Sequence, residues 1–398
     1  MLNKNKLQLA LSVVGLSVIS TQAVADARGF AMGGVGVATS NYLAAPMYNP
    51  ALAANYDRER DNFGMLLPTF SAGVHDGDDL YNKLDAFADL TDELEFGDAN
   101  SATAAEWKKA LLDLDGGKGV VDAELGLVIA IPNRFASISF FTKAEVAMIV
   151  TPDVDKRDQD LVNNDGTINS CDDGKSLEEC MQSSAQGLGA VIGEVGLTIA
   201  GSKLLQLGDK DYPVSFGLSP KAQHLMAINY TTKASDFDDD EFGDDYTEKT
   251  VFNADFGMTI QPNARTTVGF VAKNLLKQEL ETNNSSGTDV MLVEPQYAVG
   301  VGYNYGWVTL AADVDLNERQ YFRDLDYATQ FASIGAEINA WRWAQVRVGY
   351  KHSMTDHSED VVSAGLGLTP FGRFGMDLSA QYGDDSRYGV AAQFIFTF

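Results

Sequence analysis

The chain has 398 residues and carries 56 Asp and Glu against 29 Lys and Arg, a formal net charge of −27. So acidic a chain repels phosphate backbones, and we therefore expect no nucleic-acid partner. Hydrophobic residues make up 45% of the sequence, which excludes a disordered acidic tail.

The first 25 residues have the pattern of an export signal. Lys4 and Lys6 precede an apolar run over residues 7–19, and Ala23 and Ala25 fit an A-x-A cleavage site. The run is shorter than the roughly 20 residues that a transmembrane helix needs. We therefore expect residues 1–25 to be a signal peptide of an exported protein.

Residues 26–60 are rich in Gly and Ala and contain the stretch ARGFAMGGVGVATSNYLAAPMYNPA. A phosphate loop does not fit, because no strand precedes the glycines and the Lys-Ser/Thr pair is absent. Glycines instead let one backbone approach another closely, which suits a hatch segment threaded through the inside of a barrel. The residues singled out for this role are Gly33, Gly34, Gly36, Asn49 and Pro50.

The rest of the chain alternates between apolar and polar residues with a period of two, which is typical of strands. About 14 segments show it, a number within the range of outer-membrane barrels. They are 61–74, 119–131, 134–150, 186–201, 213–233, 250–261, 264–274, 295–304, 306–316, 328–340, 342–352, 359–369, 373–383 and 387–398.

Three features favour a membrane barrel over an ordinary antiparallel sheet, which also alternates. Many segments have the length of a tilted transmembrane strand. Aromatic residues such as Trp307, Trp341 and Phe398 collect at segment ends, as interfacial residues do. Tight turns and long connections alternate, which puts all tight turns on one side of the membrane. We predict an all-β fold, a transmembrane antiparallel β-barrel over 61–398 with the hatch segment in its lumen.

Charged residues fall on the strand face that would point into this lumen. An outward charge near the middle of the membrane would cost roughly 2–4 kcal/mol, whereas an inward one meets water or a partner. Mutual pairing and contact with a solute are both open as roles for these side chains. The predicted lumen-facing residues are Lys273, Asp313, Asp315, Glu337, Arg347, Lys351 and Asp377.

Two long connections have features of their own. Residues 75–118 carry an apolar stripe at helical spacing, which fits either a helical cap over the outer mouth or a loop that packs on its own barrel. Residues 151–185 form an acidic loop that holds the only two cysteines, Cys171 and Cys180. In an exported protein we expect these two residues to form a local disulfide.

Calcium is the one cofactor for which the sequence offers candidates, and the alternative is a solvated acidic loop. Asn163, Asp165 and Asp172 are the candidate ligands. Asn163 and Asp165 match positions of an EF-hand loop, but Leu161 stands where the first ligand should be. A second acidic stretch, 236–245, offers charge density alone.

The stretch HSMTDHSED brings together the residue types of a catalytic triad. His352, Asp356, His357 and Ser358 could supply a base, an orienting acid and a nucleophile. Polar outer loops collect such residues by chance, and we therefore predict that the protein is not an enzyme.

The pattern ARGxxMGGxGVA…NPA, followed by a barrel that ends in Phe, resembles the FadL-type outer-membrane proteins. The mature chain as a whole resembles the TraF-like conjugal-transfer proteins. The resemblance implies a barrel of roughly fourteen strands, a hatch made by the N-terminal segment, and diffusion of small hydrophobic molecules. It carries over no ligand-contacting residue.

Two functions are open at this point. The first is a transport barrel in the outer membrane of a Gram-negative bacterium, surrounded by lipid and passing hydrophobic small molecules. The second is a scaffold or partner in conjugation, secretion or adhesion, in which the long acidic loops contact a cell-envelope protein. The hatch-like segment favours transport.

Overall fold

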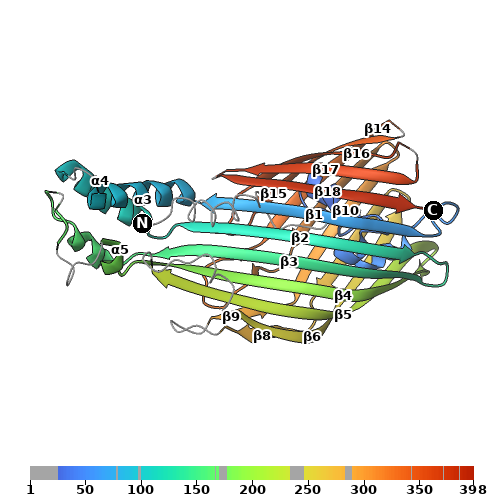
Figure 1. The fold of residues 1–398 in the computed structure, drawn as a ribbon. Helices are drawn as coiled ribbons and strands as arrows, with labels where there is room; N and C mark the ends of the chain where they lie inside the picture. Colours follow the sequence, from blue (N-terminus) through green and yellow to red (C-terminus); the bar gives the residue numbers. More distant parts are fainter. Residues whose placement is uncertain are drawn as a thin grey trace.

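The computed structural model describes residues 26–77, 79–96, 100–165, 167–169, 177–233, 246–282, 289–341, 343–370, 372–384 and 386–398. The predicted signal peptide lies outside these residues. Strands form a closed antiparallel barrel that is the main body of the structure (Figure 1). The predicted fold class is confirmed.

Fourteen strands make up the barrel, and each pairs with its neighbours along the chain. The barrel closes where the first strand pairs with the last, from Gly64 opposite Thr397 to His75 opposite Arg387. In chain order the strands are β1 (Gly64–Gly77), β2 (Lys118–Ile131), β3 (Ser137–Asp153), β4 (Ser184–Leu207), β5 (Lys210–Lys233), β6 (Tyr246–Asn263), β7 (Thr266–Lys273), β10 (Gln296–Tyr305), β11 (Val308–Asp315), β14 (Phe331–Trp341), β15 (Ala344–Ser353), β16 (Val361–Leu368), β17 (Phe374–Gly383) and β18 (Arg387–Thr397).

The two faces of the barrel wall differ in polarity. Large apolar side chains such as Val195, Ile334 and Val348 are exposed on the outside, whereas polar ones such as Glu124 and Thr198 are buried inside. Because hydrocarbon surrounds a membrane barrel, exposed apolar side chains are stable there, and polar ones are stable in the lumen. The outer face of the barrel meets lipid rather than water, so exposed Phe398 is stable there.

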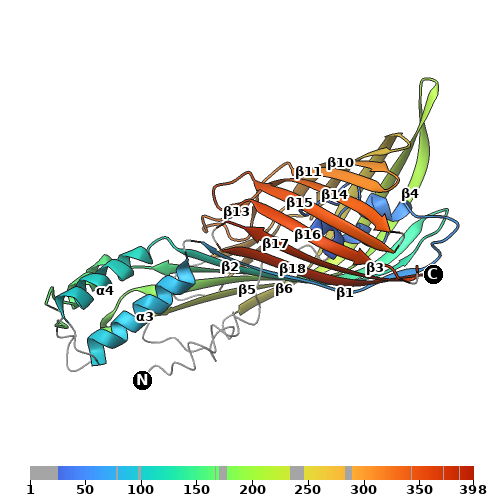
Figure 2. The same ribbon diagram turned by 90° about the horizontal axis from the view of Figure 1, so that it is seen from above.

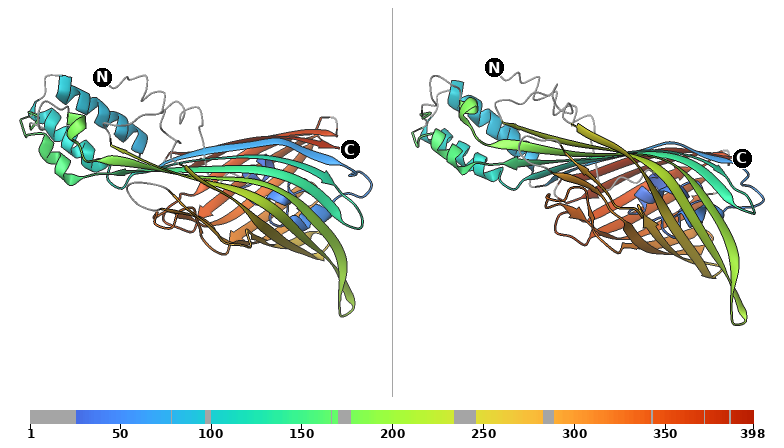
Figure 3. Two further views of the ribbon diagram at one scale, coloured as in Figure 1. Left: turned by 60° about the horizontal axis from the view of Figure 1, so that its bottom comes forward. Right: turned by 90° about the horizontal axis from the view of Figure 1, so that it is seen from below.

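The N-terminal segment lies inside the barrel (Figure 3). It contains α2 (Ala27–Ala31) and two short 3-10 helices, η1 (Ala45–Met47) and η2 (Pro50–Ala54). Helix α2 begins after Asp26, whose carboxylate accepts the N–H of Gly29 at 2.9 Å. Residues 26–56 are almost all buried, whereas residues 57–60 are exposed. We call residues 26–56 the hatch segment from here on.

A cluster of helices lies at the end of the molecule opposite the C-terminus (Figures 1 and 2). It consists of α3 (Leu80–Phe96), α4 (Ser101–Asp113), η3 (Lys156–Leu161) and α5 (Leu177–Cys180). Trp107 is fully buried at its centre, 5.4 Å from the ring of Phe87, and donates to Thr91 Oγ1 at 2.9 Å. The helices thus pack on one another and on Val162 and Met181 to form what we call the tip cluster. Within the described residues, no helix is both long and apolar enough to span a bilayer.

Asp158 ties the tip cluster together. Its side chain is 2% exposed and accepts the N–H groups of Gln182 and Ser183 and the hydroxyl of Ser183. We expect Asp158→Ala to lower the local unfolding free energy by about 1–3 kcal/mol, because buried donors lose their acceptor. Hydrogen exchange of residues 156–183 would show faster opening in this variant. Exposed Asp160 gives the matched control, and equal exchange in Asp158→Ala and Asp160→Ala would contradict the prediction.

The hairpin of β4 and β5 extends beyond its neighbours at the end where the C-terminus lies (Figures 2 and 3). β3 follows β4 only to Ala200, whereas β4 continues to Leu207 opposite Lys210. The sequence analysis treated 202–212 as a loop, and this prediction was wrong. Alternation fails as a signal here because both faces of the ribbon are exposed, as Leu204 and Leu205 show.

Two long connections fold back toward the inner wall. They contain the short strands β8 (Gln278–Glu281), β9 (Val290–Val293), β12 (Arg319–Gln320) and β13 (Ala328–Thr329). The sequence analysis did not predict the first three, and it treated β13 as the start of one strand over 328–340. Buried side chains from these connections pack against inward residues of β3, β4 and β5. This apolar cover consists of Ala147, Leu188, Ala190, Ile192, Leu225, Ala227, Leu280, Met291, Val293, Tyr321 and Phe322.

Candidate functional site

The hatch segment contacts the wall at positions where the strands carry glycine. A Cβ at Gly349 would lie 2.1 Å from the backbone N of Gly33, and one at Gly217 would lie 2.2 Å from the carbonyl carbon of Pro50. Backbone therefore packs on backbone around the lumen. Backbone atoms of the hatch segment would clash with a Cβ at the wall glycines Gly217, Gly269, Gly335 and Gly349, and its side chains would clash with one at Gly257, Gly300, Gly302 and Gly365. Sequence analysis missed them, although they recur at inward positions of successive strands.

The five residues singled out for the hatch all lie inside the barrel. Gly33 and Gly34 have positive φ values of 77° and 89°, and Gly33 donates its N–H to Ser363 Oγ at 2.9 Å. Gly36 donates to Asp313 Oδ2 at 2.6 Å. Asn49 donates to the carbonyl of Val37 at 2.8 Å and caps η2, whose first residue is Pro50.

A chain of buried polar groups fastens the start of the hatch segment to the wall. Arg28 Nε lies 2.8 Å from Glu337, and Arg347 Nε lies 2.7 Å from the same carboxylate. Arg347 also pairs with Asp377, which accepts from Gln393 at 2.6 Å. Gln393 in turn accepts the N–H of Ala27 at 2.9 Å. Three predicted lumen residues, Glu337, Arg347 and Asp377, thus act together as an anchor.

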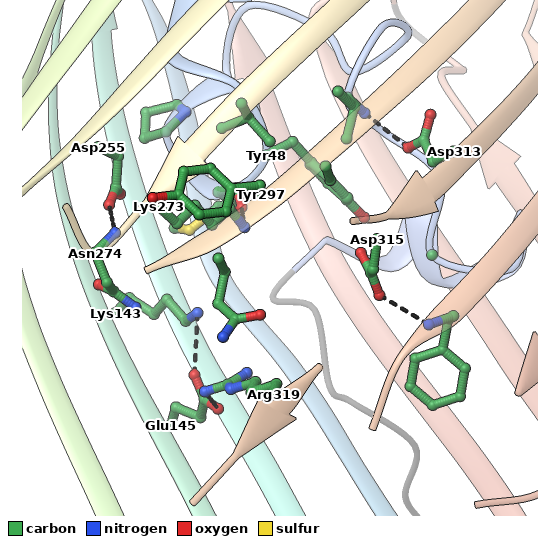
Figure 4. Close-up of a pocket in the computed structure, with 18 of the residues that line it drawn as sticks. Tyr48, Lys143, Glu145, Asp255, Lys273, Asn274, Tyr297, Asp313, Asp315 and Arg319 are labelled. Carbon is green, nitrogen blue, oxygen red and sulfur yellow. Dashed lines mark hydrogen bonds and ion pairs between the residues drawn. The ribbon is translucent and has the colours of Figure 1, made fainter. Parts of the chain in front are cut away.

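A cavity of about 160 Å³ lies between the hatch segment and the inner wall (Figure 4). Pro46, Met47 and Tyr48 of the hatch segment line it on one side. Ile192 belongs both to its lining and to the apolar cover, so the cover lies directly next to the cavity. Its charged lining residues are Lys143, Lys221, Lys273, Arg319, Lys351, Glu145, Glu194, Asp255, Asp313 and Asp315.

Three of the lining cations are neutralised by carboxylates. Lys143 Nζ lies 3.1 Å from Glu124 and 3.3 Å from Glu145, and Arg319 also pairs with Glu145. Figure 4 shows Lys143, Glu145 and Arg319 side by side in the cavity. Lys221 Nζ lies 2.9 Å from Glu194 and 3.0 Å from Asp255. These groups form closed ion-pair sets within the wall.

The remaining four predicted lumen residues also line the cavity. Asp313 accepts two backbone N–H groups of the hatch segment, and Asp315 accepts the N–H of Phe331 at 3.0 Å. Lys273 Nζ donates to the carbonyl of Met47 at 2.6 Å. Lys351 Nζ lies 4.9 Å from the centre of the Phe331 ring. The structure therefore divides the predicted set between the cavity and the anchor.

The sequence analysis missed several cavity residues, and only one of them for a physical reason. Lys143, Glu194 and Lys221 occupy inward positions of β3, β4 and β5, so strict alternation along these strands could have revealed them. Arg319 could not be found this way, because it reaches the lumen on a connection that folds inward.

Two of the three calcium candidates, Asn163 and Asp165, lie in the described residues, and both form hydrogen bonds with Thr167. Asn163 Nδ2 donates to Thr167 Oγ1 at 2.9 Å, and Asp165 accepts the N–H of Thr167 at 3.0 Å. Asp172, Cys171 and residues 236–245 lie outside the described residues, so the disulfide with Cys180 stays a prediction. In the part of the chain that the structure describes, no three His, Cys, Asp or Glu side chains gather as a metal site would require.

The candidate triad residues contact other partners. Ser358 Oγ accepts a hydrogen bond from Arg387. His352 Nδ1 lies 2.8 Å from Asp360, and His357 Nε2 lies 3.2 Å from Asp326. A nucleophile activated by a histidine needs the two side chains within hydrogen-bond reach, and no such bond joins Ser358 to either histidine among the described contacts.

A model of the family described as "F plasmid transfer operon, TraF, protein" matches residues 46–315, more than half of the chain. The chain belongs to this family. No curated protein matches it in sequence.

The fold of this TraF-family barrel is similar to two solved structures. The Ralstonia pickettii toluene transporter TbuX has a TM-score of 0.53 at 11% identity, covering 93% of this chain and 97% of that chain. The CymD monoaromatic hydrocarbon channel has a TM-score of 0.50 at 11% identity, with the same coverage of both chains. The predicted TraF-like family is therefore confirmed by the family match, and at this identity the two solved structures show a shared barrel fold.

Proposed function

We propose that this TraF-family barrel lies in the outer membrane of a Gram-negative bacterium and passes small molecules with an apolar body by diffusion. The observation that carries the proposal is the cavity between the hatch segment and the apolar cover, inside a barrel whose outer face is apolar. The fold that it shares with a toluene transporter and a monoaromatic hydrocarbon channel supports the same function. In this proposal the chain is a channel rather than an enzyme and needs no cofactor.

The solute would meet the apolar cover, the cavity and the hatch segment in turn. A solute enters from the side of the tip cluster, displaces side chains of the apolar cover, and reaches the cavity. The hatch segment then closes the way to the opposite end, because its backbone packs on the wall glycines. Apolar contacts in the cover are non-directional, so they can open and close at low cost compared with a hydrogen-bonded plug.

We expect outer-membrane vesicles that contain the barrel to take up toluene faster than vesicles without it. A lipopolysaccharide leaflet is needed in the assay, because an ordinary phospholipid bilayer offers little resistance to an apolar solute. Removal of residues 26–56 should raise uptake further and should also admit polar solutes of similar size. Equal toluene uptake with and without the barrel would refute the transport function.

A second function, as a scaffold in conjugation or secretion, is favoured by one specific observation. The β4–β5 hairpin presents exposed Leu204, Leu205 and Leu207 outside the barrel wall, where a cell-envelope protein could bind. Under this function, deleting the gene would depress mating or assembly, whereas toluene uptake would be unchanged.

A further inference from the structure

Two cations of the cavity lack the carboxylate partners that the other three have. Lys273 and Lys351 have no carboxylate oxygen within 4.0 Å among the described residues, whereas Lys143, Lys221 and Arg319 each have at least one. Each cavity carboxylate accepts from one of these three cations or from a backbone N–H group, although Oδ1 of Asp313 is buried without a hydrogen-bond partner among the described residues. The cavity thus presents two ammonium groups that its own walls do not neutralise by contact.

Lys351 is the more unusual of the two. Its side chain is 3% exposed, it lines the cavity, and its described contact is with the face of the Phe331 ring. A buried ammonium is costly to keep unless an anion or several acceptors compensate for the water it has lost. Lys273 uses one of its three donors on the carbonyl of Met47, which leaves two donors for a ligand.

The rest of the lining suits a compact apolar body. Phe331 and Tyr48 contribute aromatic faces, and Val37 and Val271 contribute aliphatic ones. An apolar cavity of about 150 Å³ binds benzene, so the cavity of about 160 Å³ has room for a ring. A hydrocarbon would satisfy these walls but would leave both ammonium groups without a carboxylate in contact.

We propose that this cavity binds a small organic anion, a monocarboxylate with an aromatic ring as its body, held by Lys351 and Lys273. The inference rests on the proposed transport function and names the substrate class of that same cavity. The carboxylate would contact the ammonium groups, and the ring would lie against Phe331 and Tyr48. Charge-assisted hydrogen bonds are the stronger kind, so the anionic group would decide which ring compounds are retained.

Benzoate, benzyl alcohol and acetate separate the parts of this proposal in titration calorimetry of the full-length barrel in detergent. Benzyl alcohol keeps the ring and removes the charge, and acetate keeps the charge and removes the ring. We expect benzoate to bind at least tenfold more tightly than either. Equal binding of benzoate and benzyl alcohol, equal binding of benzoate and acetate, or no binding of benzoate would each overturn the proposal.

Variants of opposite sign test the residues. Lys351→Met and Lys273→Met should each weaken benzoate binding by roughly ten- to a hundredfold, the range for a hydrogen bond to a charged group. Asp315→Asn should strengthen it, because the Asp315 carboxylate acts electrostatically on both lysines. Exposed Lys203 on the protruding hairpin provides the matched control, and Lys203→Met should leave binding unchanged. Unchanged affinity in both cavity variants would overturn the assignment.

Two arms of the experiment protect it against a folding defect. The comparison of the three ligands needs only the native chain, and Lys351→Gln offers a polar replacement if Lys351→Met does not form a barrel. Failure here is also distinct from failure of the transport function. Toluene uptake without benzoate binding would refute only the anion site, whereas benzoate binding without any uptake would refute the transport function.

Discussion

Gly349→Ala is expected to destabilise the barrel by about 3 kcal/mol or more, at the upper end of the cost of overpacking a core. The new Cβ would lie 2.1 Å from both the N of Gly33 and the carbonyl carbon of Met32, and 2.6 Å from Ser363 Oγ. Two of these atoms belong to the backbone of the hatch segment, which cannot rotate away as a side chain can. The hatch segment must therefore shift, and with it the hydrogen bond from Gly33 to Ser363.

The measurement is the free energy of unfolding in urea, read from the shift in gel mobility between folded and unfolded barrel. Protease cleavage within residues 26–56 reports displacement of the hatch segment separately. Gly193 supplies the matched control, because its Cβ would meet nothing closer than 3.8 Å. Equal stability of Gly349→Ala and Gly193→Ala would show that the hatch segment does not press on the wall.

Glu337→Gln is expected to cost about 3–5 kcal/mol of stability, the range found when one partner of a buried ion pair is removed. The Glu337 carboxylate accepts from Arg28 at 2.8 Å and from Arg347 at 2.7 Å, with all three side chains about nine-tenths buried or more. The neutral amide of this variant leaves Arg28 without its counter-charge. The amide also places its two N–H donors opposite the guanidinium groups of Arg28 and Arg347. The anchor of α2 would then open before the barrel unfolds.

An exposed pair gives the contrast for this prediction. Arg60 and Asp57 are 85% and 51% exposed, so Arg60→Gln should change stability by no more than about 1 kcal/mol. Unfolding in urea measures both variants, and hydrogen exchange at Ala27–Ala31 reports the local opening. A change in Glu337→Gln as small as that in Arg60→Gln would mean that water reaches the anchor.

The barrel could be predicted from the sequence because each strand has one face in lipid and one in the lumen. Residues such as Val346 and Val348 then alternate with Arg347 for a purely local reason, and the pattern survives without knowledge of the partner strand. The aromatic residues at segment ends and the alternation of short and long connections can also be recognised from the sequence alone. The pairing of β1 with β18 follows from closing the barrel, whereas the register between them cannot be read from either segment.

The candidate site was harder to predict because it depends on contacts between distant parts of the chain. Alternation marks Lys351 and Lys143 alike as inward, but only the fold shows that Lys143 meets Glu124 while Lys351 meets Phe331. Arg319 lies on a connection without periodicity, and the wall glycines acquire meaning only once the hatch segment lies beside them. The polar lumen was therefore predictable, but the pairing within it was not.

The seam between β1 and β18 constrains how this molecule can be assembled. Ala27 donates its N–H to Gln393, 366 positions later in the chain, so the start of the hatch segment cannot complete its contacts until the last strand is in place. Contacts of such long range are slow to form. The strands must therefore close into a barrel around the hatch segment. A chaperone that held residues 26–56 extended would have to release them before β1 pairs with β18.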